Sequence, residues 1–174
     1  MSRFPTGPTG RVEVDEVDAG GEDGAARGRL VLERTFRAPI ADVWASLTEP
    51  ERFARWYGPM EGEPGPGRTI TVTMAPEDEI VALPVTIIEC DPPISFVVDL
   101  GDPARPWRIS VVLGEADGIT TMTFVQTLSD EVDTTEVGPG WEFYADRMTA
   151  ALEGGEMPDW DGDSYQDTLG PHYS

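Results

Sequence analysis

The sequence is short of the residues on which several kinds of protein chemistry depend. It has one cysteine, Cys90, one histidine, His172, and no lysine, since all 12 basic residues are arginine. A single cysteine rules out an intramolecular disulfide, and one histidine near the end of the chain argues against a catalytic triad or a multi-histidine metal site. We therefore expect no metal and no cofactor, and we expect Cys90 to be a small buried side chain within a strand.

Long apolar runs and positive charge are also missing. No segment approaches the roughly 18 consecutive apolar residues of a membrane-spanning helix, and the start, MSRFPTGPTG, lacks the apolar core of a signal peptide. The 33 acidic residues outnumber the basic ones and give a formal net charge of −21. Because nucleic acids and anionic membranes both attract clustered Lys and Arg, we expect neither as a partner, and we predict a cytoplasmic protein.

Two short helices are predicted directly after a first strand at residues 30–37. Pro39 fits the first turn of a helix whose apolar residues recur at helical spacing, namely Ile40, Val43, Trp44 and Leu47. Thr48 and Glu51 then have the spacing of a capping box, which predicts a second helix that ends before Gly58. The helical stripe points Trp44 at the sheet, so we interpret this residue as structural.

A run of strands follows. From residue 68 the apolar period changes to two, and five strand candidates succeed one another up to residue 128. Asp117 and Gly118, between alternating segments, predict a tight hairpin. Pro84 lies inside one candidate strand and cannot donate a backbone hydrogen bond, so it predicts an edge strand or a bulge.

A long amphipathic helix is predicted near the C-terminus. Residues 138–140, Gly-Pro-Gly, lead into residues 141–153, and Gly154 ends the helix. Glu142 and Asp146 lie on its polar stripe, where we expect them to form surface ion pairs.

The order of these elements predicts an α+β fold. A continuous meander is antiparallel, and only the last helix is long enough to cover its apolar face, so we expect a curved sheet wrapped round that helix. We expect one domain at residues 29–155. Residues 1–28 would be an acidic Gly/Pro-rich arm that adds an edge strand, and residues 156–174 a polar tail that packs on the body through Trp160, Tyr165 and Tyr173.

Two motifs carry a resemblance to a known family. The pattern R-A-P-x-x-x-V-W-x-x-L-T-x-P-x-x-x-x-x-W-Y-G-P spans Arg37 to Pro59, and G-W-E-x-Y-x-D-R-M spans Gly140 to Met148. Together they resemble the START-related superfamily called SRPBCC, in the branch of the C-terminal domain of the activator of the heat-shock-protein-90 ATPase. The resemblance covers about residues 30–153. It implies the helix-grip fold, also known as START-like or birch-pollen-allergen-like, with a cavity between sheet and helix.

Such a cavity would be lined by large apolar and aromatic side chains. Alternation and helical phase predict as ligand-binding residues Trp56, Tyr57, Met74, Met122, Phe124, Trp141, Tyr144 and Met148, with Trp56 and Tyr57 at the mouth. Core packing alone would also explain each of these residues, because burying one aromatic ring stabilises a fold by roughly 4 to 6 kcal/mol.

Three functions fit the sequence. The first is a binding domain that encloses a small hydrophobic or aromatic molecule. The resemblance also implies two others, a protein-interaction module that contacts a chaperone and a cyclase- or hydrolase-like enzyme. The enzyme would work through a cavity carboxylate or arginine, for which the candidates are Glu33, Arg34, Asp146 and Arg147.

Overall fold

The computed structural model describes residues 5, 7–14, 28–74, 80–129, 132–159 and 162–174. The strands are β1 (Gly10–Val14), β2 (Gly28–Phe36), β3 (Met60–Glu61), β4 (Thr69–Met74), β5 (Val81–Asp91), β6 (Ser95–Leu100), β7 (Trp107–Ala116) and β8 (Ile119–Leu128). The helices are α1 (Ile40–Thr48), α2 (Pro50–Phe53), α3 (Thr134–Glu153), α4 (Gly162–Leu169) and the 3₁₀ helix η1 (Gly170–Tyr173).

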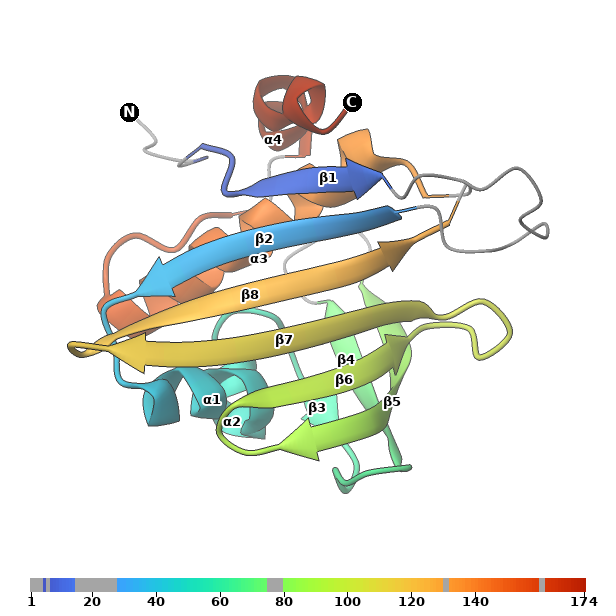
Figure 1. The fold of residues 1–174 in the computed structure, drawn as a ribbon, viewed down its shortest axis with the longest axis vertical. Helices are drawn as coiled ribbons and strands as arrows, with labels where there is room; N and C mark the ends of the chain where they lie inside the picture. The colour runs from blue at the N-terminus through green and yellow to red at the C-terminus, as the bar shows by residue number, and fades with distance from the viewer. Residues whose placement is uncertain (1–4, 6, 15–27, 75–79, 130–131, 160–161) are drawn as a thin grey trace.

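All eight strands form one antiparallel sheet in the order β1-β2-β8-β7-β6-β5-β4-β3. Strands β3 to β8 are therefore neighbours in sequence order, and β2 joins the sheet beside β8, with Gly28 opposite Leu128 and Phe36 opposite Thr120. The sheet curves, and α3 lies along its inner face while α1 and α2 lie at one end (Figure 1). The α+β helix-grip fold predicted from the sequence is confirmed.

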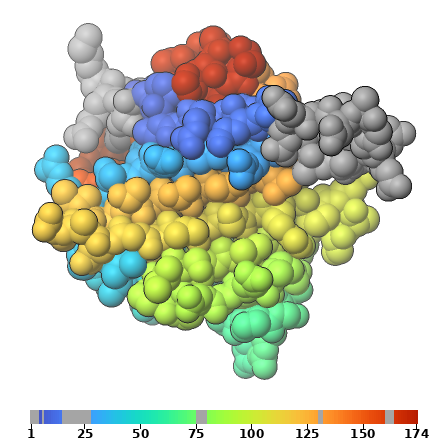
Figure 2. All heavy atoms as spheres, viewed as in Figure 1, coloured from blue at the N-terminus to red at the C-terminus, as the bar shows by residue number. Residues whose placement is uncertain are grey.

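Strict alternation on the strands builds the core between the sheet and α3. On β2, Leu30, Leu32 and Phe36 are almost completely buried, and they pack in one cluster with Phe143 and Met148 of α3. Because residues two apart share a face, one side of each strand lines this interior. The other side forms the outer surface that faces the viewer in Figure 2.

Several local signals are confirmed. Asp117 and Gly118 join β7 to β8 with φ angles of 54° and 77°, the left-handed conformations that a tight hairpin requires. Gly154 ends α3 with a φ of 81°. The Asp117-Gly118 pair and Gly154 thus predicted where elements end, which the hydrophobic period alone does not show.

The start of α3 was predicted too late. The helix begins at Thr134, and Pro139 lies inside it rather than before it. Asp133 is the reason, because its side chain accepts hydrogen bonds from the backbone N–H of Thr135 at 3.0 Å and from the Thr135 hydroxyl at 2.6 Å. This cap starts the helix about two turns earlier than the Gly-Pro-Gly segment suggests.

The capping box at Thr48 is also wrong. Thr48 is the last residue of α1, and its hydroxyl donates to the carbonyl of Trp44 at 2.8 Å instead of capping the next helix. Glu49 occupies the N-cap of α2 without a side-chain hydrogen bond, and α2 is a single turn.

Pro84 lies in an internal strand and not at an edge, but the strand that carries it does contain a bulge, as the second alternative predicts. β5 runs between β4 and β6, and its register shift falls later, between Ile87 and Glu89. The Pro84 carbonyl accepts from the backbone N–H of Gly101, one residue beyond the end of β6. The N–H and C=O of one residue point to the same side of an antiparallel strand, so the nitrogen of Pro84 also points towards β6. Because β6 has already ended at this position, the missing N–H removes no hydrogen bond of the sheet.

Both terminal segments pack at the edge of the sheet that β1 forms. β1 pairs with β2, α4 and η1 lie against α3, and η1 also contacts β1 (Figures 1 and 2). Tyr165 of α4 and Tyr173 of η1 are 2% and 1% exposed. Trp160 lies outside the described residues. The division of the chain into arm, domain and tail stays a prediction.

Candidate ligand-binding cavity

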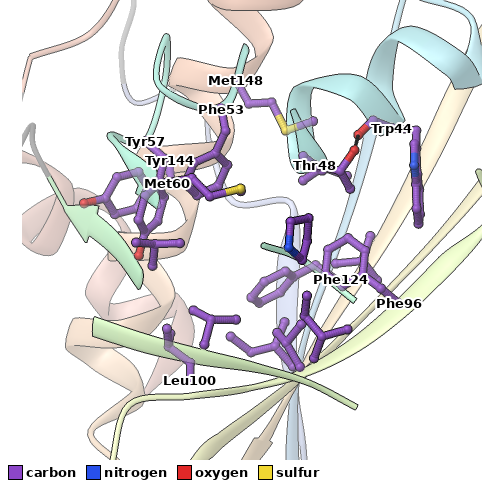
Figure 3. Close-up of a pocket in the computed structure, with 18 of the residues that line it drawn as sticks. Trp44, Thr48, Phe53, Tyr57, Met60, Phe96, Leu100, Phe124, Tyr144 and Met148 are labelled. Carbon is purple, nitrogen blue, oxygen red and sulfur yellow. Dashed lines mark hydrogen bonds between the residues drawn. The ribbon is translucent and has the colours of Figure 1, made fainter. Parts of the chain in front are cut away.

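A cavity of about 430 Å³ lies between α3 and the inner face of the sheet. Trp44 and Thr48 of α1 border one side, Tyr144 and Met148 of α3 another, and side chains of β4 to β8 form the floor. Figure 3 shows these side chains surrounding an open space, with Phe96 from the sheet opposite the helices. The gap exists because the curved sheet diverges from α3, which approaches it closely at β1 and β2.

Seven of the eight predicted site residues line this cavity, namely Trp56, Tyr57, Met122, Phe124, Trp141, Tyr144 and Met148. Met74 is not among the lining residues. It follows Ile70 and Val72 on the same face of β4, which do line the cavity, but it ends the strand and lies beyond the enclosed space. Contact of these residues with a ligand stays a prediction.

Aromatic rings form much of the wall. Phe53 stacks on Tyr57 with ring centroids 4.7 Å apart, and Tyr57 stacks on Tyr144 at 4.6 Å. Phe124 packs against Trp141 at 4.8 Å. Trp56 and Tyr57 are 7% and 5% exposed, so they lie within the wall rather than at an exposed mouth.

Trp44 has a second role that the sequence reading missed. It packs edge-on against Phe96 at 5.8 Å, as a structural residue would, but it also lines the cavity. The floor residues Phe96, Val98 and Leu100 on β6 were missed as well. Their alternation along the strand was a usable signal, since they share the inward phase.

Two of the three indole N–H groups in the wall, those of Trp56 and Trp141, are already used by the protein. Trp56 Nε1 donates to the carbonyl of Ser46 at 2.8 Å, and Trp141 Nε1 donates to Gln126 Oε1 at 2.7 Å. No Asp, Glu, Arg or His is present among the lining residues in the described part of the chain. The cavity is therefore built to hold an apolar, uncharged body.

Cys90 does not have the buried position expected from the sequence. It is exposed, near the end of β5, and its side chain borders the cavity. Partial burial, together with the neighbouring Asp91 carboxylate, raises the pKa of the thiol. A raised pKa keeps the thiol protonated at neutral pH, so Cys90 lacks the thiolate character of a nucleophile.

The expected surface ion pairs on α3 are instead a buried charged cluster. Glu142 and Asp146 are 0% and 1% exposed, and both bind Arg34 of β2. Arg34 Nη2 donates to Glu142 Oε2 at 2.8 Å, and Nη1 donates to Asp146 Oδ1 at 2.7 Å. The prediction failed because the C-terminal segment covers the polar stripe of α3. Without that segment the stripe would face water.

The C-terminal tyrosines complete this cluster. Tyr165 donates its hydroxyl to Asp146 Oδ2 at 2.8 Å, and the Tyr173 hydroxyl donates to Glu142 Oε1. Thr9 adds its backbone N–H to Glu142 Oε1 at 2.6 Å. Burial, and then the neighbouring carboxylates, raise the pKa of both tyrosine hydroxyls, so they stay protonated donors.

The cluster and the cavity occupy different sides of α3. Arg34, Glu142 and Asp146 do not line the cavity. Their side-chain oxygens and nitrogens bind each other and the terminal segments, so the arrangement is that of a structural lock rather than of an acid and base facing a substrate.

Across the described residues, no three His, Cys, Asp or Glu side chains gather as a metal site would require. None of the helices in this part of the chain is long and apolar enough to cross a membrane.

Comparison with protein families gives a match over most of the domain. The profile of the family described as "Activator of Hsp90 ATPase homolog 1-like protein" matches residues 37–153. This range runs from the residue after β2 to the last residue of α3, and thus contains most of the cavity wall. No curated protein matches the sequence.

Solved structures show the same fold at low sequence identity. CalU16 from Micromonospora echinospora is 19% identical, with a TM-score of 0.72 and 94% of each chain covered. A protein encoded by gene BPP1335 of Bordetella parapertussis is 18% identical, with a TM-score of 0.66 and 92% of each chain covered. DynU16, from the dynemicin biosynthetic locus, is 18% identical with a TM-score of 0.64, over 81% of this chain and 51% of DynU16.

Proposed function

This chain belongs to the Activator of Hsp90 ATPase homolog 1-like family, within the SRPBCC superfamily, and we propose that it encloses a small hydrophobic or aromatic molecule between its sheet and α3. The observation that carries the proposal is the cavity of about 430 Å³, which falls in the range of roughly 300–1,000 Å³ typical of small-molecule sites. Of its residues, Trp56, Tyr57, Met122 and Phe124 are proposed to contact the ligand, as are Trp141, Tyr144 and Met148.

The chemistry of the wall supports an apolar, flat ligand. The tilted rings of Tyr144 and Trp141 offer surface on which an aromatic molecule gains contact area. The flexible thioethers of Met122 and Met148 adjust to its outline. A carboxylate to drive catalysis is missing from the described lining residues, which favours binding over the cyclase- or hydrolase-like alternative.

Native mass spectrometry of protein purified without detergent tests the proposal, followed by organic extraction of what is released. We expect either a retained apolar compound or an empty chain that takes up one equivalent of an added polycyclic aromatic probe. A chain that carries no compound and takes up no such probe at micromolar concentration would overturn the proposal.

A second candidate is a protein-interaction module, which the family description favours. In this function an outer surface of the domain would contact a heat-shock-protein-90-type ATPase. Isothermal titration of the purified chaperone with this chain tests it, and the absence of binding at micromolar concentration would count against it.

A further inference from the structure

Gln126 is a fully buried amide beside the cavity, and its nitrogen has no partner within the described residues. The residue lies on the inner face of β8 and is 0% exposed. Its Oε1 accepts from Trp141 Nε1 at 2.7 Å, whereas its Nε2 has no hydrogen-bond partner within the described residues. Since an indole N–H only donates, the amide must turn its oxygen to Trp141, which leaves the NH₂ group as the unused donor.

The neighbours of Gln126 place this donor at one end of the cavity. Ile109 lies directly opposite on β7, Phe124 is two residues away on the same face of β8, and Trp141 covers the amide from α3. All three line the cavity. Nε2 belongs to the same amide as Oε1, which accepts from the Trp141 indole, so Nε2 also lies close to the Trp141 ring that forms the wall.

We propose that Gln126 Nε2 donates a hydrogen bond to an oxygen acceptor at one end of the bound ligand. This inference rests on the proposed function and names the ligand class more closely, as an aromatic molecule with an uncharged acceptor such as a ketone or quinone oxygen. A carboxylate is disfavoured, because no arginine or histidine lines the described part of the cavity and would balance its charge.

The donor lies one side chain behind the wall, so the ligand oxygen approaches it between Ile109 and Trp141. Trp141 is only partly buried, and the proposal requires its ring to shift so that this approach opens. A buried NH₂ group without an acceptor is unfavourable, so the ligand oxygen gains a donor that is already free of competing protein acceptors in the described structure.

A matched pair of probes tests the inference. Fluorene and 9-fluorenone share one tricyclic skeleton and differ in the carbonyl, and their dissociation constants are measured for the wild-type chain and for Gln126→Met. The variant keeps the length of the side chain but removes the donor. Thr121→Val is the control, because Thr121 is exposed on the outer face of the same strand. Comparing the fluorenone-to-fluorene ratio of dissociation constants between the variant and the wild-type chain cancels the different solubilities of the probes.

We expect Gln126→Met to weaken fluorenone relative to fluorene by about tenfold, and Thr121→Val to leave the ratio unchanged. An unchanged ratio in Gln126→Met would overturn the role of Gln126 and leave the cavity proposal standing. Wild-type protein that binds neither probe would overturn both.

A second measurement needs no variant. The carbonyl stretching band of fluorenone bound to the wild-type chain should lie below its position in hexane, because a hydrogen bond weakens the C=O bond. A band at the hexane position would overturn the inference even if Gln126→Met failed to fold.

Discussion

Tyr57 and Tyr144 stack with ring centroids 4.6 Å apart and ring planes 29° from parallel. This contact fastens the turn after α2 to the middle of α3, and Phe53 extends the stack on the far side of Tyr57. One wall of the cavity is therefore braced by rings that hold each other in place. The space between this wall and the sheet is set by the architecture, which suits a site that is formed before its ligand arrives.

Filling the cavity should abolish ligand uptake without unfolding the domain. Val98 on β6 faces the cavity, and Val98→Trp would place an indole in the open space. We expect at least a tenfold loss of aromatic-probe binding, with a melting temperature within a few degrees of wild type, because the added ring has room. Probe titration and thermal unfolding measure the two effects.

The matched control is Val97→Trp, one residue earlier, where alternation turns the side chain to the outer face of the same strand. It should bind the probe as wild type does. Equal probe binding by the two variants would contradict the position of the site.

Gly138 makes room for the C-terminal tyrosine. A Cβ built on Gly138 would collide with the ring of Tyr173, whereas one built on Gly140, two residues later in α3, meets nothing within 4 Å. We expect Gly138→Ala to lower the free energy of unfolding by about 1–3 kcal/mol through overpacking. Gly140→Ala should raise it by about 0.5–1 kcal/mol through helix propensity. Urea titration followed by circular dichroism measures both, and a stabilising Gly138→Ala would show that Tyr173 does not pack there.

Arg34 holds two buried carboxylates, so its removal should be costly. In Arg34→Met the carboxylates of Glu142 and Asp146 remain buried without their cation, and we expect a loss of about 3–5 kcal/mol in the free energy of unfolding. Arg108→Met is the control. Arg108 binds Asp99 through two hydrogen bonds of 2.8 and 2.9 Å, but its side chain is 53% exposed, and we expect a loss below about 1 kcal/mol. Similar losses from the two variants would contradict a structural role for the buried cluster.

The fold could be predicted from the sequence more completely than the buried polar contacts could. The hydrophobic period and the Asp117 turn predicted the meander. Seven of the eight predicted side chains line the cavity, because alternation in strands and phase in helices determine which side chains point to the interior. The buried positions of Glu142 and Asp146 were missed, since a charged stripe on an amphipathic helix is ordinarily solvated. The expectation is reversed by contacts between distant segments, in which Tyr165 packs onto Asp146 and Tyr173 onto Glu142.

Tyr165 and Tyr173 should make the protein sensitive to alkali. Burial and the adjacent carboxylates raise the pKa of both hydroxyls in the folded chain above the ordinary value near 10. A raised folded pKa means that the folded state keeps its proton while the unfolded state loses it. The associated stability is therefore fully present below about pH 10 and is lost as pH rises from there towards the folded pKa. Each tyrosine should lower the free energy of unfolding by about 1.4 kcal/mol per pH unit in that window.

Urea unfolding between pH 8 and pH 11 measures this dependence. Tyr165→Phe and Tyr173→Phe should each start from a lower stability at pH 8, because a buried carboxylate loses a donor. Each should then decline less steeply above pH 10, because the titrating group is gone. Tyr57→Phe is the comparison outside the cluster, and it should keep the slope contributed by the two C-terminal tyrosines. If the C-terminal variants declined as steeply as wild type, the hydroxyls would not be held as buried donors, and the lock between the C-terminal segment and α3 would have to rest on packing alone.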